Sequence, residues 1–443
     1  MQNRLVLSAI ASAFLAGEQS VDAAKERAIR ALGQRWRWVG PLAQRYIEEY
    51  AGKTRPTYRA VVRFLVDDHG FADAWMTYSR KIRVVQWLTD SQLMLPVRAA
   101  ANWDVPPIES AGALADWLQV TPGELDWFAD LKGLMSVTKS SPKLRHYYYK
   151  VRSKGSGGIR LIEAPKSRLK KIQQQILGGI LNGIPTHPAV HGFCKGRSIK
   201  TFVTPHVAQR VVLRMDLENF FPSISGARVQ AFFRTAGYPG SVAETLGGIC
   251  TNATPQEVWR QQEFKFDQRQ MKEARRLYQW PHLPQGAPTS PALANLCAYR
   301  VDCRMAGLAA AAGAVYTRYA DDLTFSGGEE FERRVQRFAA HVAAILHEEG
   351  FRVHHRKTRV MRQGVRQHVA GLVANQSVNV VRADFDVLKA TLTNCLRSGP
   401  DDQNREAHPN FRAHLDGRVG FVEMINPAKG KRLREILDRV EWR

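Results

Sequence analysis

The sequence predicts a mixed α/β chain, in which an all-helical N-terminal region precedes a split βαβ sheet and a C-terminal set of helices. Three observations predict this class. Residues 1–135 follow helical patterns with short breaks at 51–56 and 104–107. Residues 136–375 alternate strand and helix signals, and residues 376–443 return to helical patterns. We therefore expect three domains with these boundaries.

Each element of the middle region has its own signal. Strands are predicted by a short apolar run at 211–215, by two β-rich runs around a polar turn at 315–325 and by strand-like runs at 351–381. Helices are predicted by an alanine- and leucine-rich stretch at 290–313 and by an amphipathic stretch at 329–349. After residue 383 we expect two or three helices, with Pro427 in the first turn of the last one.

The composition bounds the class of protein. A chain of 443 residues suggests two to three domains at about 150 residues each. The hydrophobic fraction of 44% and the charged fraction of 24% exclude a disordered or fibrous chain. The 64 Lys and Arg residues exceed the 41 Asp and Glu residues by 23. Such a surplus indicates a polyanionic partner, most often nucleic acid and less often an anionic membrane surface.

Cysteine usage and hydropathy indicate a cytoplasmic protein without a membrane span. The five cysteines contain no C-x-x-C pair, which argues against a disulfide framework or a zinc ribbon and favours a reducing cytosol. No apolar run reaches the roughly 20 residues that a span requires. Residues 5–17 resemble a short signal-peptide core, but we prefer a first helix. Its core-facing residues would be Leu5, Ile10, Phe14 and Leu15.

Tryptophan is concentrated near the N-terminus. Seven of the ten tryptophans lie in the first 135 residues: Trp36, Trp38, Trp75, Trp87, Trp103, Trp117 and Trp127. Tryptophan at this density is mostly helix-packing core. A stacking surface for RNA bases is the alternative interpretation.

A basic segment opens the middle region. Ten Lys and Arg residues and a single acid, Glu163, lie between positions 143 and 171. Strand-like runs flank the glycine-rich stretch 154–158, which predicts a hairpin whose tip presents positive charge and backbone N–H groups to phosphates. A solvated charged face is the alternative explanation of such a run.

Three aspartates form the strongest chemical signal. Asp321 and Asp322 lie in the predicted turn, where Asp is a common residue on its own account. Asp216 ends the apolar run at 211–215, and a carboxylate at the end of a buried strand requires a partner. If that strand lies beside the hairpin, the three carboxylates converge. Carboxylates together with substrate phosphates are the usual ligands of Mg²⁺, and two ions about 4 Å apart can activate a hydroxyl and stabilise a leaving pyrophosphate.

Several segments resemble known motifs. Residues 214–224, 283–291 and 319–322 resemble reverse transcriptase motifs, in the same order along the chain. The segments that resemble bacterial retron reverse transcriptases in particular are 191–193, 196–199, 316–318, 323–326 and 357–360. The resemblance covers about residues 143 to 435 and leaves the N-terminal region unexplained. Retron enzymes usually carry Val-Thr-Gly where this chain has Val-Ala-Gly at 369–371, so reverse transcriptases of other defence systems or of group II introns stay open.

The resemblance implies an α+β right-hand polymerase with a ferredoxin-like palm, fingers and a helical thumb, behind the N-terminal helical domain. It implies RNA-directed DNA synthesis from dNTPs with two Mg²⁺ ions. A retron enzyme would copy its cognate structured noncoding RNA into multicopy single-stranded DNA, primed from an internal 2′-hydroxyl. That product would serve antiphage defence, with an effector protein as a possible partner. Only 68 residues follow position 375 and they carry no second acidic cluster, so an RNase H domain is not expected.

The resemblance also implies roles for site residues. The catalytic carboxylates would be Asp216, Asp321 and Asp322, which would hold the metals together with the backbone carbonyl of Leu217. Phe221 aligns with the residue that excludes a ribose 2′-hydroxyl and so selects deoxynucleotides. Plain core packing is the alternative for Phe220 and Phe221, and we expect one of them to pack in the core.

Further residues would contact the nucleotide. Gln285 and Gly286 resemble the loop that supports the incoming nucleotide and the template base. The same stretch also suits a helix start, with Ser290 as its N-cap. Arg160 matches an arginine that grips the triphosphate, and Lys154 would assist it as a point charge.

The nucleic acid would meet a second basic run. The residues expected to contact primer and template are Tyr319, Arg352, Arg356, Lys357, Arg359 and Arg362. Strand alternation limits the contact to one face of the run, and strand packing is the alternative for Tyr319. His187, His191 and Cys194 suggest a metal site by spacing, but a loop with satisfied side chains explains them better.

Two other functions compete with reverse transcription. An RNA-dependent RNA polymerase would share the three carboxylates, but Phe221 argues against ribonucleotides. A non-catalytic RNA-binding protein would explain the positive charge but would not require Asp216, Asp321 and Asp322 together.

Overall fold

The chain mixes helices and strands as the sequence predicts. The computed structural model describes residues 2–53, 56–88, 93–137, 142–154, 158–260 and 266–442. The chain folds into two compact units, and both are discontinuous in sequence: unit 1 contains 1–185 and 221–297, and unit 2 contains 186–220 and 298–443.

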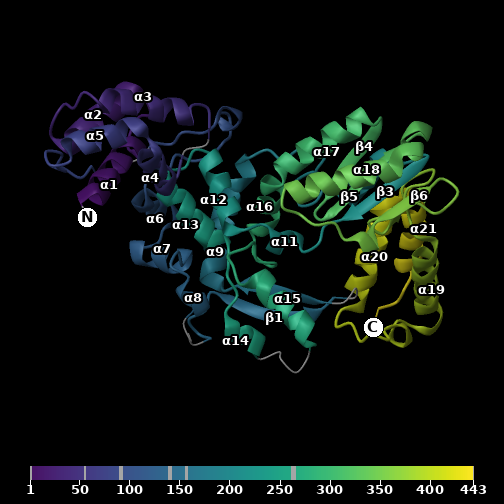
Figure 1. Cartoon of the computed structure of the whole chain (residues 1–443). Coiled ribbons are helices and arrows are strands. Elements are labelled where there is room, and N and C mark those ends of the chain that lie inside the picture. The colour runs from purple at the N-terminus through teal and green to yellow at the C-terminus, as the bar shows by residue number, and fades with distance from the viewer. Residues whose placement is uncertain are drawn as a thin grey trace. The chain divides into compact units, whose positions relative to one another are not determined.

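The N-terminal part of unit 1 is helical (Figure 1). Its first helices are α1 (Gln2–Leu15), α2 (Val21–Leu32), α3 (Val39–Tyr50), α4 (Tyr58–Asp67) and α5 (His69–Tyr78). They enclose one core, and Ile10, Phe14 and Leu15 are buried in it as predicted. The prediction for Leu5 is wrong, because its side chain is 49% exposed. The buried stripe of α1 runs through Val6 at i, i+4 and i+8 spacing with Ile10 and Phe14, one position away from Leu5.

The helical pattern continues with interruptions that the sequence predicts. The next elements are the 3-10 helix η1 (Arg98–Ala100), α6 (Ala111–Leu118), α7 (Pro122–Ala129) and α8 (Leu134–Val137). Residues 104–107 are not helical, and neither are the described residues of the first predicted break, 51–53 and 56. Most of the N-terminal tryptophans are partly buried against helices, as the packing interpretation predicts, whereas Trp87 is 50% exposed and Trp127 41% exposed.

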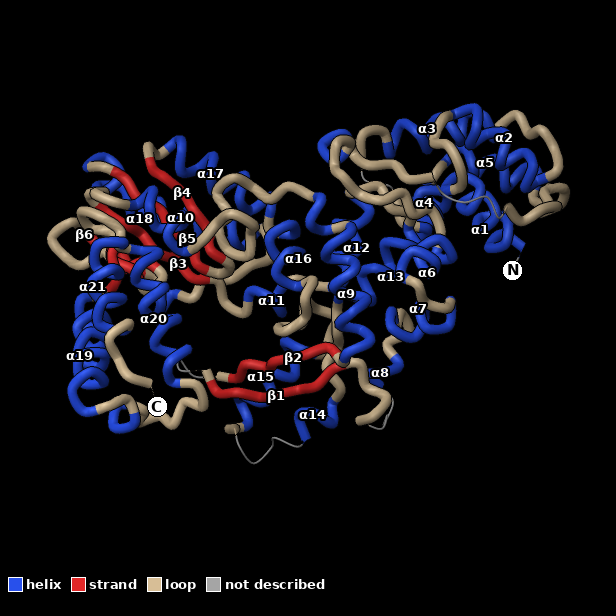
Figure 2. Tube along the Cα trace, turned by 180° about the vertical axis from the view of Figure 1, so that it is seen from behind, coloured by secondary structure: helices blue, strands red, loops and turns tan. Residues whose placement is uncertain are grey.

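The rest of unit 1 contains a hairpin and further helices. Strands β1 (Tyr147–Ser153) and β2 (Ile159–Pro165) pair antiparallel, so the predicted hairpin is confirmed. The predicted tip falls partly on residues 155–157, which lie outside the described residues. Figure 2 shows β1 and β2 as a two-stranded ribbon next to α15. The helices of this part are α9 (Ser167–Gly179), η2 (Leu181–Gly183), α12 (Gly226–Thr235), α13 (Gly240–Cys250), α14 (Gln256–Arg260), α15 (Gln268–Tyr278) and α16 (Ser290–Cys297).

Unit 2 is built on a four-stranded antiparallel sheet, and α11 (Phe220–Ser223) leads from it into unit 1. The strand order is β4-β5-β3-β6, with bounds Ala314–Tyr319, Asp322–Gly327, Val211–Asp216 and Arg359–Arg362. Helices α17 (Tyr299–Ala311) and α18 (Glu329–Glu348) lie against one face of this sheet (Figure 1). The stack of Tyr316 on Phe325, with Phe338 edge-on to Phe325, fills the space between this face and α18. The strands and helices predicted for 211–215 and 315–349 are therefore confirmed.

The opposite face of the sheet joins a C-terminal helical core. Val212 of β3 packs there with Phe202 and with three helices, in agreement with the two or three expected after residue 383. The elements are α10 (Ile199–Val203), η3 (Thr204–His206), η4 (His355–Lys357), β7 (His368–Val369), β8 (Leu372–Val373), β9 (Asn379–Val380), α19 (Arg382–Ser398), η5 (Asp401–Gln403), α20 (Phe411–Ile425) and α21 (Pro427–Leu437). Pro427 opens α21 behind the N-cap Asn426, as predicted.

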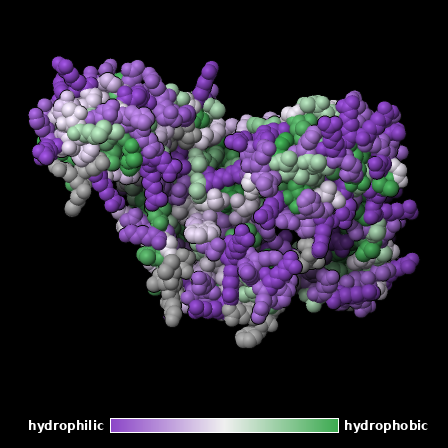
Figure 3. Space-filling view, in the orientation of Figure 1, coloured by the Kyte–Doolittle hydropathy of each residue, from purple (hydrophilic) through white to green (hydrophobic). Residues whose placement is uncertain are grey.

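The surface is mostly hydrophilic. Hydrophilic side chains cover most of the face seen in Figure 3, with smaller hydrophobic patches between them. Among the described residues, no helix has the length and apolarity of a membrane span.

Candidate active site

The strand register brings the three aspartates to one end of the sheet in unit 2. Asp216, the last residue of β3, lies opposite Asp322, the first residue of β5. Asp321 precedes Asp322 in the hairpin turn, and its carbonyl oxygen accepts a 2.9 Å hydrogen bond from the backbone N–H of Leu217. The sequence condition for convergence, that the strand lies beside the hairpin, is therefore met.

Two cations neutralise two of the three carboxylates. The Lys357 ammonium lies 2.8 and 3.1 Å from the two oxygens of Asp216. The Arg214 guanidinium donates to Oδ1 of Asp322 at 2.7 and 3.0 Å. Since Arg214 and Asp216 are two residues apart on β3, their side chains lie on the same face of the sheet.

Burial and mutual repulsion act on the carboxylates. Burial raises the pKa of Asp321, and the neighbouring charges of Asp216 and Asp322 raise it further. Burial also raises the pKa of Asp322, although the Arg214 guanidinium opposes that shift. An added cation would relieve this repulsion.

The donor set suits a hard divalent cation, but two of the three carboxylates, Asp216 and Asp322, are paired with protein cations. Across the described ranges, no group of three or more His, Cys, Asp or Glu side chains is arranged to hold a metal ion. The convergent carboxylates nevertheless match the oxygen ligands that Mg²⁺ prefers.

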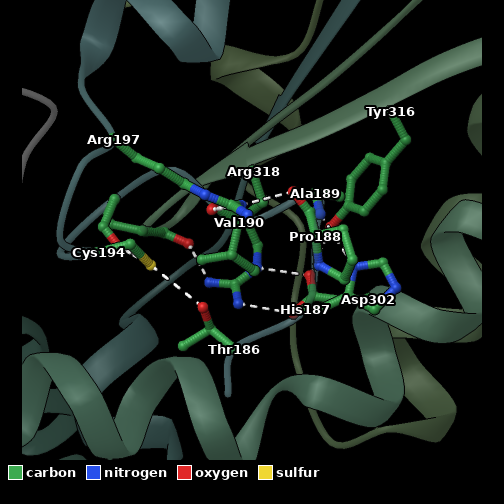
Figure 4. A network of polar contacts seen from close by, with 12 residues as sticks. Thr186, His187, Pro188, Ala189, Val190, Cys194, Arg197, Asp302, Tyr316 and Arg318 are labelled. Carbon is green, nitrogen blue, oxygen red and sulfur yellow. Dashed lines mark hydrogen bonds and ion pairs between the residues drawn. The ribbon is translucent and has the colours of Figure 1, made fainter. Parts of the chain in front are cut away.

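A buried ion pair supports the turn that carries Asp321. Arg318 and Asp302 are both fully buried and are joined by two 2.7 Å hydrogen bonds. The remaining arm of Arg318 donates to the carbonyl oxygen of Ala320 at 3.0 Å, and the hydroxyl of Tyr316 donates to Asp302 at 2.8 Å (Figure 4). Ala320 has a φ of 55°, a left-handed conformation that costs energy for any residue with a Cβ atom. The arginine therefore anchors a strained residue next to the carboxylates.

A loop of unit 2 pairs with the edge strand of the hairpin. The backbone N–H of Arg318 donates to Ala189, and that of His191 donates to Arg318, both at 2.8 Å. Arg197 ties the loop together by donating to the carbonyls of Pro188 and Val190 (Figure 4).

This loop requires a glycine at position 192, because the chain passes very close to the hairpin turn there. A Cβ atom at Gly192 would lie 2.7 Å from the backbone nitrogen of Ala320. The segment 191–193, noted in the sequence only for its resemblance to retron enzymes, thus packs directly on the turn that carries Asp321.

The spacing of His187, His191 and Cys194 does not produce a metal site in the described part of the chain. Nδ1 of His187 accepts from the backbone of Ala189, and His191 bonds to Thr201. The Cys194 thiol lies 3.4 Å from the hydroxyl of Thr186. The interpretation as a loop with satisfied side chains is supported.

Phe220 and Phe221 have different environments. Phe220 is 4% exposed and lies between the ring of Phe351 at 5.8 Å and the guanidinium of Arg318 at 5.6 Å. Phe221 is only half-buried. Phe220 is therefore the member of the pair that packs in the core, and sugar selection by Phe221 stays a prediction.

Within unit 1, the loop expected to support the nucleotide docks on β2. The carbonyl of Gln285 accepts from the backbone N–H of Glu163 at 2.9 Å. Gly286 has a φ of 136°, and a Cβ atom there would lie 2.8 Å from the Glu163 carbonyl oxygen. Arg160 lies on the same strand with an exposed side chain, so β2 carries one predicted nucleotide contact and packs against the loop that carries two others. The backbone N–H of Lys154 donates to Gly158 at 3.0 Å and closes the described end of the hairpin.

A buried hydrogen-bond network surrounds the side chain of Glu163 at this docking site. The Glu163 carboxylate is fully buried and accepts hydrogen bonds from Asn252, Thr254 and His282. Burial lowers the pKa of His282, but the Glu163 charge outweighs it and raises the pKa overall. The prediction that Ser290 is an N-cap is wrong: helix α16 begins at Ser290 itself, whose hydroxyl donates to the Pro284 carbonyl.

The predicted nucleic-acid contacts of unit 2 differ in their surroundings. Arg352, Arg356 and Arg359 are exposed and show no acidic partner among the described residues. Arg362 instead pairs with Glu332 at 3.1 Å. Tyr319 lies near the rings of Phe193 and Phe202, at 6.3 and 5.7 Å, as ordinary strand packing would place it.

Sequence reasoning missed the groups that support the carboxylates. It assigned Lys357 to nucleic acid, whereas the structure places its ammonium at Asp216. The role of Arg214 has a visible signal, since it is two residues before Asp216 on one strand. Asp302 shows no local signal, because its partner Arg318 is 16 residues away in the sequence.

This constellation matches a known family. Residues 151–380 match the model of the reverse transcriptase (RNA-dependent DNA polymerase) family. The chain belongs to this family. Its members generally use divalent metal ions, in agreement with the donor set of the three aspartates.

Three relatives illustrate the similarity. The retron Mx65 reverse transcriptase of Myxococcus xanthus is 42% identical over 302 residues, which cover 67% of this chain and 66% of that protein. The retron Mx162 enzyme of the same organism is 35% identical over 78% of this chain and 69% of its own length. The retron Ec86 reverse transcriptase of Escherichia coli is 29% identical over 67% of this chain and 82% of its own length.

Proposed function

We propose that this reverse transcriptase is a retron enzyme, which copies a cognate structured noncoding RNA into multicopy single-stranded DNA that serves antiphage defence. The family match and the retron names of the relatives support the proposal. The observation that carries the chemistry is the register that sets Asp216 opposite Asp322, with Asp321 in the adjoining turn.

In this proposal Asp216, Asp321, Asp322 and the Leu217 carbonyl hold two Mg²⁺ ions. The bound ions supply activation of the primer hydroxyl and stabilisation of the leaving pyrophosphate. Arg214 keeps Asp322 oriented, and Lys357 neutralises Asp216 until the ions bind. The carboxylates must be ionised to act as ligands, so a pKa raised by burial disfavours the reaction at acid pH.

The architecture would be that of a right hand. The β4-β5-β3-β6 sheet would serve as palm, the part of unit 1 that carries the β1–β2 hairpin as fingers, and helices α19 to α21 as thumb. Arg160, with Lys154, would grip the triphosphate, and Gln285 and Gly286 would support the nucleotide. Phe221 would exclude the ribose 2′-hydroxyl. The cognate RNA, its DNA product and an effector protein are the expected partners, in the cytoplasm.

Primer extension on an RNA template tests the enzymatic part. We expect extension with dNTPs and Mg²⁺, little with NTPs, and none after chelation. Extension with NTPs alone would indicate an RNA polymerase, and RNA binding without any extension would indicate a non-catalytic protein. The variant Asp402→Asn changes an exposed aspartate of η5 and serves as a matched control for aspartate substitutions.

The cognate RNA tests the retron assignment. Purification of the protein from its native host should recover an RNA covalently linked to single-stranded DNA through a 2′-phosphodiester. Recovery of unlinked RNA, from a preparation that extends primers, would favour another class of bacterial reverse transcriptase.

A further inference from the structure

A second concave site lies among the N-terminal helices, outside the residues that match the reverse transcriptase family. The pocket has a volume of about 390 Å³ and lies between the loop before α3 and helix α5. We call it the tryptophan pocket. Its charged and aromatic lining residues are Arg35, Trp36, Arg37, Trp38, Asp73 and Tyr78.

The walls of the tryptophan pocket are aromatic. The Trp36 ring lies 5.2 Å from Tyr78, and the Trp38 ring lies edge-on to Phe71 at 5.6 Å. Both indoles are only half-buried, so part of each ring borders the pocket. Aromatic faces of this kind stack with nucleobases of any sequence.

Both indole nitrogens are unsatisfied donors. Nε1 of Trp36 and Nε1 of Trp38 are buried and have no hydrogen-bond partner among the described residues. A buried indole N–H normally finds an acceptor. Two such donors beside one pocket suggest that small side-chain movements would offer them to a bound acceptor.

Helix α5, which lines one side of the pocket, is anchored at its N-terminal end. Arg45 of α3 forms two hydrogen bonds with Asp68, at 2.7 and 2.8 Å, and Asp68 caps α5 by accepting from the backbone N–H of Phe71. A Cβ atom at Gly70 would lie 2.4 Å from Arg45, so the glycine gives this ion pair room. A site that is already fixed loses little entropy when it binds a ligand.

The rim of the pocket is positively charged. The side chain of Arg35 is 79% exposed, and its one acidic contact among the described residues is with the exposed Glu26 at 3.5 Å. Arg37 is exposed and has no acidic partner in the part of the chain that the structure describes. Residues 1–88 carry 14 Lys and Arg against 8 Asp and Glu, a surplus of 6. Arginines next to aromatic faces match the phosphates and bases of a nucleic acid.

We propose that the tryptophan pocket binds an unpaired nucleotide of the RNA that the enzyme carries. The base stacks on Trp36 and Trp38, and the flanking phosphates contact Arg35 and Arg37. Asp73 accepts a hydrogen bond from the ribose 2′-hydroxyl, which favours RNA over DNA. An acidic peptide fits less well, because its carboxylates would pair with the arginines but leave the aromatic faces unused. The inference relies on the proposed function only for the identity of the RNA.

Photocrosslinking tests the site directly. The full chain is mixed with a short single-stranded RNA that contains 5-iodouridine, without metal or dNTPs, and irradiated. We expect a crosslink in the peptide that contains Trp36 and Trp38, mapped by mass spectrometry. The same oligonucleotide as DNA should give a weaker crosslink there. Equal crosslinking of DNA would overturn the assignment to RNA, and a crosslink map without this peptide would overturn the site.

Charge removal gives a second readout. The double variant Arg35→Ala/Arg37→Ala should bind the single-stranded RNA about tenfold more weakly. The slope of log affinity against log salt should flatten by about 1.4 units, since each phosphate contact to a single strand contributes about 0.7. The control Arg59→Ala/Arg63→Ala removes the same charge from exposed positions of α4 that do not line the pocket. Equal effects of the two double variants would contradict the proposal.

Primer extension separates this inference from the proposed function. At saturating template concentration, the Arg35→Ala/Arg37→Ala variant should extend a pre-annealed DNA primer on a generic RNA template as fast as the wild type. A protein that fails to extend but crosslinks at Trp36 and Trp38 would contradict the polymerase assignment alone. A protein that extends normally and does not crosslink there would contradict the tryptophan pocket alone.

Discussion

The three aspartates differ in how much their negative charge destabilises the folded protein. Asp216 and Asp322 each have a cation within 3 Å, whereas no such partner is found for the Asp321 carboxylate among the described residues. Burial and the two neighbouring carboxylates raise the pKa of Asp321. Its ionised form therefore destabilises the metal-free protein above this pKa, and the cost vanishes as the pH falls and the group protonates.

Asp321→Asn should separate catalysis from stability. We expect DNA synthesis to fall by at least about a hundredfold, because a metal ligand is lost. The melting temperature of the metal-free protein at pH 8 should rise, and this gain should shrink as the pH falls to 4. Primer extension and thermal unfolding with chelator measure the two effects. The control Asp402→Asn should change neither, and a destabilised Asp321→Asn protein would contradict the assigned repulsion.

Phe221→Ala should relax the choice of sugar. The side chain is half-buried, unlike Phe220, so its loss leaves the core intact. If the ring excludes the 2′-hydroxyl, the ratio of dNTP to NTP incorporation should fall at least tenfold, equivalent to about 1.4 kcal/mol of discrimination. Single-nucleotide incorporation assays measure the ratio. An unchanged ratio in a folded protein would mean that another residue discriminates.

At the scale of elements, the hairpin turn is held from behind by the Arg318–Asp302 pair. Removing one partner of a buried ion pair leaves an uncompensated charge and costs about 3–5 kcal/mol, so single variants risk unfolding. The double variant Arg318→Met/Asp302→Leu replaces the pair with apolar groups of similar size, which is often nearly neutral for stability. It still removes the hydrogen bond to the Ala320 carbonyl.

We expect the double variant Arg318→Met/Asp302→Leu to fold and to lose activity about tenfold or more. The turn that carries Asp321 would sample other conformations, so the concentration of Mg²⁺ for half-maximal activity should rise. The affinity for primer and template should not change. Metal titrations and binding assays on the same preparation distinguish positioning from a general loss of structure. Normal activity at normal Mg²⁺ would show that the turn does not depend on this pair.

A second buried contact links η3 to the same strands. His206 is fully buried, with its ring nitrogens 2.6 Å from the hydroxyl of Ser326 and 2.7 Å from that of Thr317. Burial, with a smaller contribution from His191, lowers the pKa of His206 to about 3. The neutral ring therefore stabilises the fold fully above pH 6.5, and this stabilisation is lost progressively as the pH falls toward 3.

The substitution His206→Asn should weaken this pH dependence. The value pH 5 lies about 1.5 units below an ordinary histidine pKa. At pH 5 the wild type should therefore have lost about 2 kcal/mol of unfolding free energy through protonation of His206 in the unfolded state. The variant should be less stable at pH 7.5 by about 1–3 kcal/mol, because buried hydroxyls lose a partner. Urea unfolding at pH 7.5 and pH 5 measures both effects. Parallel losses in variant and wild type would assign the pH dependence to other groups.

The elements were largely predictable from local patterns, and the supports of the site were not. Alternation and the polar turn predict β4, β5 and the carboxylate Asp216 at the end of β3, because these signals lie within short stretches of sequence. Asp302 pairs with Arg318 across 16 residues, and Lys357 reaches Asp216 across 141. Such pairs depend on how α17 and η4 pack on the sheet, which no single stretch of the sequence encodes. The exposure of Leu5 shows the same limit for the orientation of a helix.

At the scale of the whole molecule, the basic residues behind the surplus of 23 positive charges do not all have the same role. Some arginines serve the fold, as Arg318 does with Asp302 and Arg434 does with Glu423. Others are exposed without an acidic partner in the described part of the chain, including Arg352, Arg356 and Arg359. Only the second group is available to phosphates without breaking an ion pair, so net charge alone overstates the binding surface.

Salt dependence should distinguish the two groups of arginines. The triple variant Arg352→Ala/Arg356→Ala/Arg359→Ala should bind RNA more weakly, and its slope of log affinity against log salt should flatten by about 0.7–0.9 units for each phosphate that an arginine no longer neutralises. Arg362→Ala is the control on the same strand, because its guanidinium is paired with Glu332 and lies on the other face of β6 from Arg359. We expect Arg362→Ala to lower affinity only through remote charge, which is largely screened beyond about 8 Å at physiological salt. Titrations of one RNA hairpin at several salt concentrations measure the slopes. Parallel slopes for the wild type and the triple variant would show that these arginines do not touch the nucleic acid, and a flattened slope for Arg362→Ala would show that its ion pair opens on binding.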